Sequence, residues 1–129
     1  MNFALKKYHL LFILFLTITT QGQQTYGGIE IGVKAIKMSV ITIKNAEDDK
    51  YEVKDFWVEN FEKTTFVSKD GNLTQKGIDS TCLMIQNNYQ KMLRKYKIPT
   101  KNFHIIADSG IGNATNSDIL AQKIKFITN

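Results

Sequence analysis

The sequence feature that most constrains the fold is an apolar stripe with helical spacing between residues 74 and 96. Steps of four and three residues separate its members, which are Ile78, Cys82, Ile85, Tyr89, Met92 and Tyr96. Such a stripe gives an α-helix one apolar face, which has to be buried against another element. Thr74 is suited to cap this helix, and Pro99 is expected to end it, because the residue before a proline is pushed out of helical geometry.

Strand-like segments lie on both sides of this helix. Three of them precede it, at residues 26–31, 35–43 and 51–61. The loops between them are short, so the three segments are expected to form an antiparallel meander. The alternation of the third segment slips near Asp55, which predicts either a bulge or a strand that is covered on both faces.

The region after the helix is expected to add one strand and a second helix. The strand is the short apolar run 103–107, and a glycine-rich turn follows it at 108–115. Apolar residues at steps of four and three between 120 and 127 mark the second helix, which Asn116 or Ser117 is expected to cap. The order is strand, strand, strand, helix, strand, helix, which places the chain in the α/β class.

Composition limits the chain to one modest core. It has 129 residues, of which 43% are hydrophobic, with one proline and one cysteine. These values exclude collagen-like, low-complexity and disulfide-rich classes. Cys82 can form no disulfide within the chain, so we expect it to act as a small apolar residue.

The first 22 residues have the order of a secretory signal peptide. Two lysines give a basic start, an apolar run covers residues 10–18, and small and polar residues follow up to Gly22. The apolar run is well short of the roughly 20 residues that span a bilayer, which argues against a membrane anchor. We therefore expect residues 1–22 to be removed and residues 23–129 to be exported, to the periplasm or outside the cell, without a stable membrane anchor.

The charge of the chain gives no support to nucleic-acid binding. The formal net charge is +5, and it falls to +3 when Lys6 and Lys7 are removed with the signal peptide. The remaining lysines form no dense basic stripe in the sequence. We also expect no metal site, because His104 lies in a strand without a cysteine or carboxylate at metal-ligand spacing.

Two glycine-containing turns at strand ends are the candidate sites of chemistry. Glycine lets backbone N–H groups approach an anion closely, and a helix just downstream of the second turn adds a partial positive charge. We therefore predict phosphate binding by seven residues, which are Glu30, Gly32, Val33 and Lys34 in the first turn and Ser109, Gly110 and Gly112 in the second.

Neither turn completes a generic nucleotide-binding motif. Gly27 and Gly32 have the spacing of a Walker A loop, but Val33 stands where the lysine is required. Gly110 and Gly112 have the spacing that opens a dinucleotide-binding fingerprint, but its third glycine position is not filled.

Around these turns the sequence resembles a known family. Residues 28–41 are similar to the opening of the exopolyphosphatase and guanosine-pentaphosphate phosphatase family (Ppx/GppA), which has a strand, a loop of the form Asp-x-Gly-Ser-Asn-Ser and an alternating second strand. Residues 73–96 resemble the family's first long helix. Residues 103–122 resemble its fourth strand, small-residue turn and next helix, including an Ala-x-Asn step at 114–116. The resemblance covers nearly all of residues 23–129.

The resemblance implies an RNase H-like half-domain of the superfamily that includes actin, heat-shock chaperones and sugar kinases. Its expected form is three antiparallel strands, a helix, a fourth strand parallel to the first, and a second helix. It also implies that both turns face one phosphate cleft. Mg²⁺ is the candidate cofactor by this resemblance, although we expect no cofactor to be held by this chain alone.

The first turn departs from the family's loop. Glu30 stands where the family has aspartate, and Val33, Lys34 and Ala35 replace Ser-Asn-Ser, so two hydroxyls and one amide are missing. In the second turn, Gly112 falls where many members carry arginine. A phosphate site here would therefore have to rely on backbone N–H groups and Lys34.

The resemblance implies a function, with alternatives. In the family, the catalytic glutamate and a second phosphate loop, Asp-x-Gly-Gly-Gly-Ser, follow the second helix, and neither is found between Lys125 and Asn129. The first hypothesis is the N-terminal part of an exported Ppx/GppA-like phosphatase, which in the family hydrolyses polyphosphate or guanosine pentaphosphate. This chain alone is expected to be inactive because it has no catalytic residue.

One alternative is a non-catalytic exported phosphate-binding or interaction module, and another is an unrelated small α/β binding domain. In the first two hypotheses the ligand is a phosphate-containing small molecule or polyphosphate. The remainder of the domain, or a partner, is expected to cover the sheet, since an uncovered sheet face and edge are liabilities that soluble proteins avoid.

Overall fold

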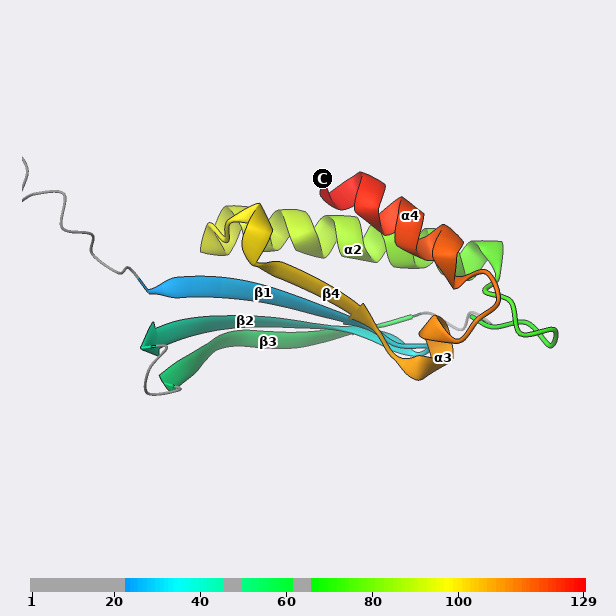
Figure 1. The fold of residues 1–129 in the computed structure, drawn as a ribbon, viewed down its shortest axis with the longest axis horizontal. Coiled ribbons are helices and arrows are strands. Elements are labelled where there is room, and N and C mark those ends of the chain that lie inside the picture. The colour runs from blue at the N-terminus through cyan, green and yellow to red at the C-terminus, as the bar shows by residue number, and fades with distance from the viewer. Residues whose placement is uncertain (1–22, 46–49, 62–65) are drawn as a thin grey trace, which may run out of the picture.

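A computed structural model of the chain describes residues 23–45, 50–61 and 66–129 (Figure 1). Residues 1–22, which carry the predicted signal peptide, lie outside the described residues, as do residues 46–49 and 62–65. The elements follow in the order β1(Gln24–Ile31), β2(Ala35–Asn45), β3(Lys50–Asn60), α2(Gln75–Tyr96), η1(Thr100–Asn102), β4(Phe103–Ala107), α3(Ser109–Gly112) and α4(Ser117–Thr128). Among these residues, no helix is long and apolar enough to cross a membrane.

The four strands form one sheet in the order β3-β2-β1-β4. β1 pairs antiparallel with β2, and β2 pairs antiparallel with β3, which gives the predicted meander. β4 returns beside β1 and runs parallel to it, with Gly27 opposite Phe103 and Ile31 opposite Ala107. The predicted class, an RNase H-like arrangement of three antiparallel strands, a helix, a parallel strand and a helix, is confirmed.

Both long helices lie on the same face of the sheet (Figure 1). The strand residues that face them alternate with residues that face away, as expected for a sheet with one buried side. The buried core joins this face to the helices, and its members include Ile29, Ile31, Ile36, Met38, Val40, Ile78, Ile85, Tyr89, Met92 and Leu120. On the opposite face no described helix covers the sheet, and several apolar side chains are exposed there, namely Tyr51, Val53, Phe56, Val58 and Ile106.

Helix α2 begins and ends as the apolar stripe predicts. The side chain of Thr74 accepts a hydrogen bond from the Gly77 N–H at 3.1 Å, which is the expected N-cap. The helix ends at Tyr96 because Lys97 adopts a left-handed backbone conformation with φ 52°. Pro99 follows two residues later, where a proline is common because it cannot continue a helix.

A buried asparagine in the middle of α2 fixes the helix against β3. The Asn88 carboxamide accepts a hydrogen bond from the Trp57 indole at 2.9 Å and donates one to the Glu59 carboxylate at 3.0 Å. Asn88 is only 2% exposed, so a hydrogen-bonded amide at this place specifies which turn of the helix meets which strand residue. The apolar stripe alone does not show this contact.

The predicted bulge in the third strand is present beside Asp55. Val40 pairs with Asp55, but the next residue, Ile41, pairs with Val53, so Lys54 is an extra residue in β3. Asp55 lies on the helix side of β3, as Trp57 does, and its carboxylate accepts hydrogen bonds from Tyr96 and Lys95 of α2.

The segment after β4, predicted as a glycine-rich turn over residues 108–115, is partly helical. Asp108 caps the short helix α3 by accepting a hydrogen bond from the Ile111 N–H at 3.0 Å. Sequence patterns miss this helix because only one turn of it forms, and two of its four residues are glycines, which disfavour helix.

Asn116 precedes α4, but its side chain does not cap that helix. It instead pairs with the backbone of Leu73, accepting from the Leu73 N–H at 2.7 Å and donating to the Leu73 C=O at 3.1 Å. These two bonds join the entrance of α4 to the entrance of α2, which lies 43 residues earlier in the chain.

We predict that Asn116→Ala destabilises the protein by about 1–3 kcal/mol, because it leaves two partly buried backbone groups of Leu73 without partners. Asn113→Ala is the matched control, since Asn113 is exposed, and it should change the free energy of unfolding by no more than about 0.5 kcal/mol. Urea denaturation of both variants measures the difference. Equal stability of the two variants would show that the pairing with Leu73 is unimportant.

A second prediction concerns pH. The Tyr96 hydroxyl and, after it, the Lys95 ammonium hold the pKa of Asp55 below its ordinary value of 3.8. These bonds therefore stabilise the fold at pH values above 3.8. Their contribution is lost as the pH falls through the lowered pKa that Asp55 has in the folded protein. In an NMR titration, Tyr96→Phe should raise the pKa of Asp55 towards its ordinary value. Tyr26→Phe, which removes a hydroxyl bonded to Gln24, should leave the pKa of Asp55 unchanged.

Candidate functional site

The two predicted turns meet where β1 and β4 end side by side. The Asp108 N–H donates a hydrogen bond to the Ile31 C=O at 2.9 Å, which extends the parallel pairing by one residue into the second turn. The first turn is tight, because the Gly32 N–H donates to the Ala35 C=O at 2.9 Å. Two segments that are more than 70 residues apart in the sequence therefore form one local structure at the carboxyl end of both strands.

Glycines allow the turns to approach this closely. A Cβ atom added at Gly32 would lie 3.0 Å from an Asp108 carboxylate oxygen and 3.2 Å from the Ala35 C=O. A Cβ atom added at Gly110 would lie 3.0 Å from a methyl group of Val33. Gly32, Val33 and Gly110 are thus brought together, and the family resemblance had implied that these two turns face each other.

Backbone donors are available at this junction. The N–H groups of Val33 and Lys34 in the first turn, and of Ser109 and Gly110 in the second, make no hydrogen bond within the described part of the chain. The latter two belong to the first turn of α3, where N–H groups have no partner in the helix itself. Lys34 and Ser109 are exposed. The Lys34 C=O accepts a hydrogen bond from the Phe61 N–H at 2.9 Å, which fixes the backbone of the first turn.

Asp108 is the residue of this junction that the prediction of site residues omitted. One of its carboxylate oxygens caps α3, and the other lies against Gly32. The carboxylate is a negative charge between the two turns, so it opposes direct binding of an anion there. Its position after a strand and before Ser109 is typical of an N-cap, and that pattern could have identified it.

Glu30 does not join this cluster through its side chain. Its neighbours Ile29 and Ile31 are buried under the helices, so Glu30 faces the opposite side of the sheet. There its carboxylate accepts a hydrogen bond from the Lys37 ammonium of β2 at 2.8 Å, in a pair that is about half exposed. In this structure the Glu30 carboxylate is therefore engaged with Lys37.

Gly112 is the other predicted residue outside the junction. An added Cβ atom would meet nothing within 4 Å of it, so the glycine is not required there by packing. Gly112 lies at the end of a groove between β4 and α4, which is described below.

A metal ion has few protein ligands here. Among the described residues, no group of three or more histidine, cysteine, aspartate or glutamate side chains could hold a metal ion. Mg²⁺ is commonly bound through one or two carboxylates together with substrate phosphates and water. Asp108 is one such carboxylate, so the junction fits Mg²⁺ only in company with a phosphate-bearing ligand.

The chain is similar in structure to several solved proteins, although no family model and no curated protein sequence matches it. A Ppx/GppA family member from Aquifex aeolicus superposes with a TM-score of 0.66 and 18% sequence identity, over 81% of this chain and 32% of that one. An exopolyphosphatase from Cytophaga hutchinsonii superposes with a TM-score of 0.67 and 17% identity, over 82% of this chain and 32% of that one. An exopolyphosphatase-like protein gives a TM-score of 0.62 and 15% identity, over 81% and 30%.

The chain thus spans about a third of the length of the solved structures that it matches. At these identities the likeness establishes the fold. The resemblance found in the sequence is confirmed at that level: this chain has the fold of an N-terminal portion of the Ppx/GppA exopolyphosphatases.

Proposed function

We propose that the junction of the two turns is a phosphate-binding half-cleft, and that this chain is the N-terminal part of an exported Ppx/GppA-like phosphatase. The observation that carries the proposal is the junction itself, where Gly32 and Gly110 bring two turns together and leave four backbone N–H groups without partners. Such groups bind phosphate oxygens in many unrelated proteins. Lys34 adds an exposed positive charge beside them.

The ligand that fits this junction is a polyanion that arrives with Mg²⁺. Asp108 would repel a bare phosphate, but the same carboxylate would attract a phosphate group that carries the cation. Polyphosphate, the substrate class named for the matched exopolyphosphatases, has this chemistry. The protein's part would be to position one phosphoryl group through backbone N–H groups and Lys34, with Asp108 orienting the hydrated cation.

Hydrolysis by this chain alone is not part of the proposal. Phosphoryl transfer needs a group that positions the attacking water and a clamp on the transferred phosphoryl. Glu30 is paired with Lys37, and Asp108 caps α3, so neither carboxylate is placed to act as a free base. We therefore expect no phosphate release when the 129-residue chain is incubated with polyphosphate and Mg²⁺.

A binding measurement distinguishes the half-cleft from the alternative, a self-sufficient phosphate-binding module. A half-cleft exposes its ligand to water on one side and should bind with a Kd near 1 mM, whereas a complete module should reach about 1 μM, a difference of about 4 kcal/mol. Isothermal titration with polyphosphate of defined length, with and without Mg²⁺, gives the value.

We predict that Lys34→Ala weakens polyphosphate binding by about three- to tenfold, because it removes one cationic contact to the ligand. The matched control is Lys101→Ala, which removes the same charge from η1 at the opposite end of β4. The control should change the Kd by less than twofold. An equal loss for both variants would mean that only the net charge matters and that the junction is not the binding site.

We also propose that the chain is exported by residues 1–22. The support is the basic start and short apolar run of that segment, as described above. N-terminal sequencing of the exported protein should begin at Gln23. Retention of Met1 in the exported protein would contradict cleavage, and retention of the whole protein inside the cell would contradict export.

A further inference from the structure

The outer edge of β3 is unpaired in the described sheet. β3 is the last strand of the sheet and pairs only with β2 (Figure 1). The Phe61 N–H donates a hydrogen bond to the Lys34 C=O, next to β2, at 2.9 Å. Successive residues of a strand alternate in direction, so the N–H and C=O groups of Phe56, Val58 and Asn60 point away from β2. An edge of this kind readily pairs with another strand.

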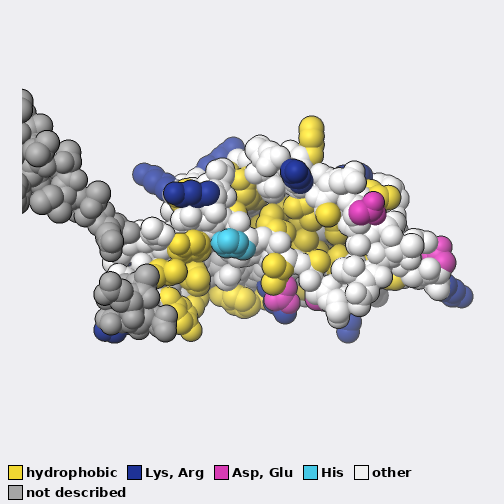
Figure 2. Space-filling view, in the orientation of Figure 1, with side chains coloured by type: hydrophobic (Ala, Val, Ile, Leu, Met, Phe, Trp, Pro, Cys, Tyr) yellow, Lys and Arg dark blue, Asp and Glu magenta, His cyan; other side chains and the backbone are white. Residues whose placement is uncertain are grey.

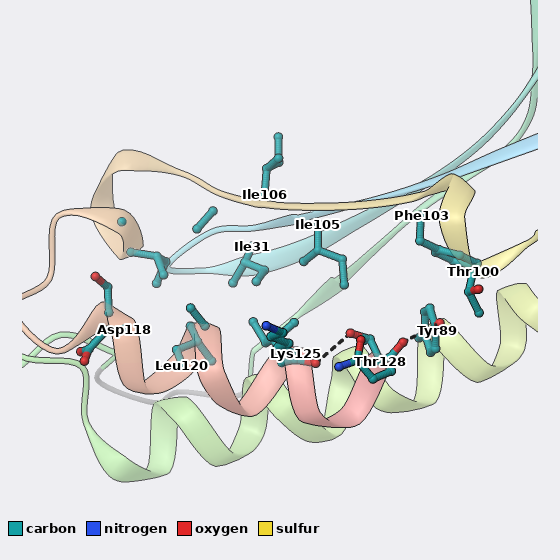
Figure 3. A pocket seen from close by; sticks show the side chains of 17 residues that line it. Ile31, Tyr89, Thr100, Phe103, Ile105, Ile106, Asp118, Leu120, Lys125 and Thr128 are labelled. Atoms are coloured by element: carbon teal, nitrogen blue, oxygen red, sulfur yellow. Dashed lines mark hydrogen bonds between the residues drawn. The ribbon is translucent and has the colours of Figure 1, made fainter.

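The opposite edge of the sheet, at β4, is flanked by helix α4 (Figure 3). The groove between β4 and α4 has a volume of about 640 Å³, and Gly112 is part of its lining. In the space-filling view, apolar side chains gather in this hollow (Figure 2). A strand of a second copy therefore reaches the β3 edge with less obstruction than the β4 edge.

Two features limit pairing to the carboxyl half of β3. The bulge at Lys54 interrupts the regular edge. The Phe56 N–H already donates a hydrogen bond to the Asp55 carboxylate at 2.9 Å, so this N–H is not available to another strand. The N–H groups of Val58 and Asn60 remain as donors. The side chains of Phe56 and Val58 are 58% and 44% exposed, so apolar surface accompanies this part of the edge.

Two opposite charges lie on the helix side of the same segment. The exposed Lys91 ammonium of α2 lies 4.5 Å from the centre of the Trp57 ring. Two residues further along β3, the Glu59 carboxylate accepts a hydrogen bond from Asn88 of α2. A positive charge over residue 57 and a negative charge at residue 59 are complementary to the same two charges in a copy that runs in the opposite direction.

We propose that two copies of the chain pair through β3, antiparallel, with Val58 of one copy directly opposite Val58 of the other. In this register each Val58 N–H donates to the Val58 C=O of the other copy. Each Asn60 N–H donates to the Phe56 C=O of the other copy, so the bonded Phe56 N–H is not needed. The pairing joins two four-stranded sheets into one continuous sheet. This proposal does not rest on phosphate binding.

Charge selects this register over its neighbours. With Val58 opposite Val58, Trp57 lies opposite Glu59 of the other copy, with Cβ atoms about 5 Å apart, so each Lys91 ammonium lies near a carboxylate. A shift that set Trp57 opposite Trp57 would bring the two Lys91 ammonium groups together and set Asp55 opposite Glu59. A shift in the other direction would set Glu59 opposite Glu59. Like charges directly opposite each other are unfavourable in both alternatives.

Sedimentation and hydrogen exchange of the full chain test the pairing. The paired segment, residues 56–60, is short and forms a small interface, so we expect a dimer with a Kd of about 100 μM. As the protein concentration rises through this value, hydrogen exchange of the Val58 and Asn60 amides should slow. Exchange of the Phe56 amide, which is bonded within its own chain, should not change.

Charge-reversal variants test the register. Lys91→Glu and Glu59→Lys each place like charges opposite each other, and each should weaken the dimer by about tenfold. An equal mixture of the two variants has opposite charges at both contacts, so it should form a heterodimer with about the wild-type affinity. Both variants should keep the fold, because Lys91 is exposed and the Asn88 side chain retains its hydrogen bond to the Met84 C=O.

A second pair of variants leaves these charges unchanged. Val58→Lys places two ammonium groups opposite each other at the centre of the contact and should weaken the dimer by at least about tenfold. Val53→Lys is the matched control, since Val53 is 56% exposed on the same strand but lies before the bulge. The control should change the Kd by less than about twofold.

The same measurements can overturn the proposal. A chain that sediments as a monomer at about 1 mM would do so, and would leave the β3 edge to a different chain. Equal weakening by Val58→Lys and Val53→Lys would contradict pairing at residues 56–60. A mixture of the charge-reversal variants that stays monomeric would contradict the register. Slower exchange of the Ile105 and Ala107 amides, without any effect on Val58, would place the contact at β4 instead.

Discussion

The parallel pairing of β1 with β4 is the constraint on which the rest of this structure depends. The first three strands can pair through short turns, but a strand parallel to β1 has to start at the same end of the sheet as β1 does. The chain must therefore travel the length of the sheet after β3, and α2 provides that path. Its 22 residues span about 33 Å at 1.5 Å per residue, which matches the length of an 11-residue strand. Only then do the turns after Ile31 and Ala107 lie side by side.

The periodic part of this architecture could be predicted from the sequence. Alternation identified the strands, and a three-and-four spacing identified both long helices, because each pattern records which side of an element is buried. The bulge beside Asp55 was also visible, since an extra residue interrupts alternation within β3. The class and the strand directions then followed from the order of elements and the family resemblance.

The contacts that fix the helices in place could not be predicted in this way. Asn88 and Asn116 make hydrogen bonds to partners that are 29 to 43 positions away in the sequence, and no local pattern records these bonds. The end of α2 also depends on the left-handed backbone conformation of Lys97, which a lysine seldom adopts. In each case the deciding interaction is tertiary or conformational, whereas the pattern reports only burial.

The candidate site also has features that sequence patterns could predict and features that depend on tertiary contacts. The two glycine-containing turns singled out in the sequence do lie side by side, and at Gly32 and Gly110 the close approach leaves little room for a side chain. The role of Glu30 was harder to predict, since it required knowing that Lys37 stands directly opposite on β2. The side of the sheet on which a strand residue lies is fixed by its buried neighbours. A site assigned by sequence order alone therefore mixes residues of both sheet faces.

The junction depends on how β4 leads into the second turn. Ala107 is the last residue of β4, and the N–H of the next residue, Asp108, donates a hydrogen bond to the Ile31 C=O at the end of β1. The parallel pairing therefore continues into the turn itself, so the backbone of the second turn is held by the sheet. The position of the N–H groups of Ser109 and Gly110 relative to those of Val33 and Lys34 is set by the same pairing that sets the register of β1 and β4.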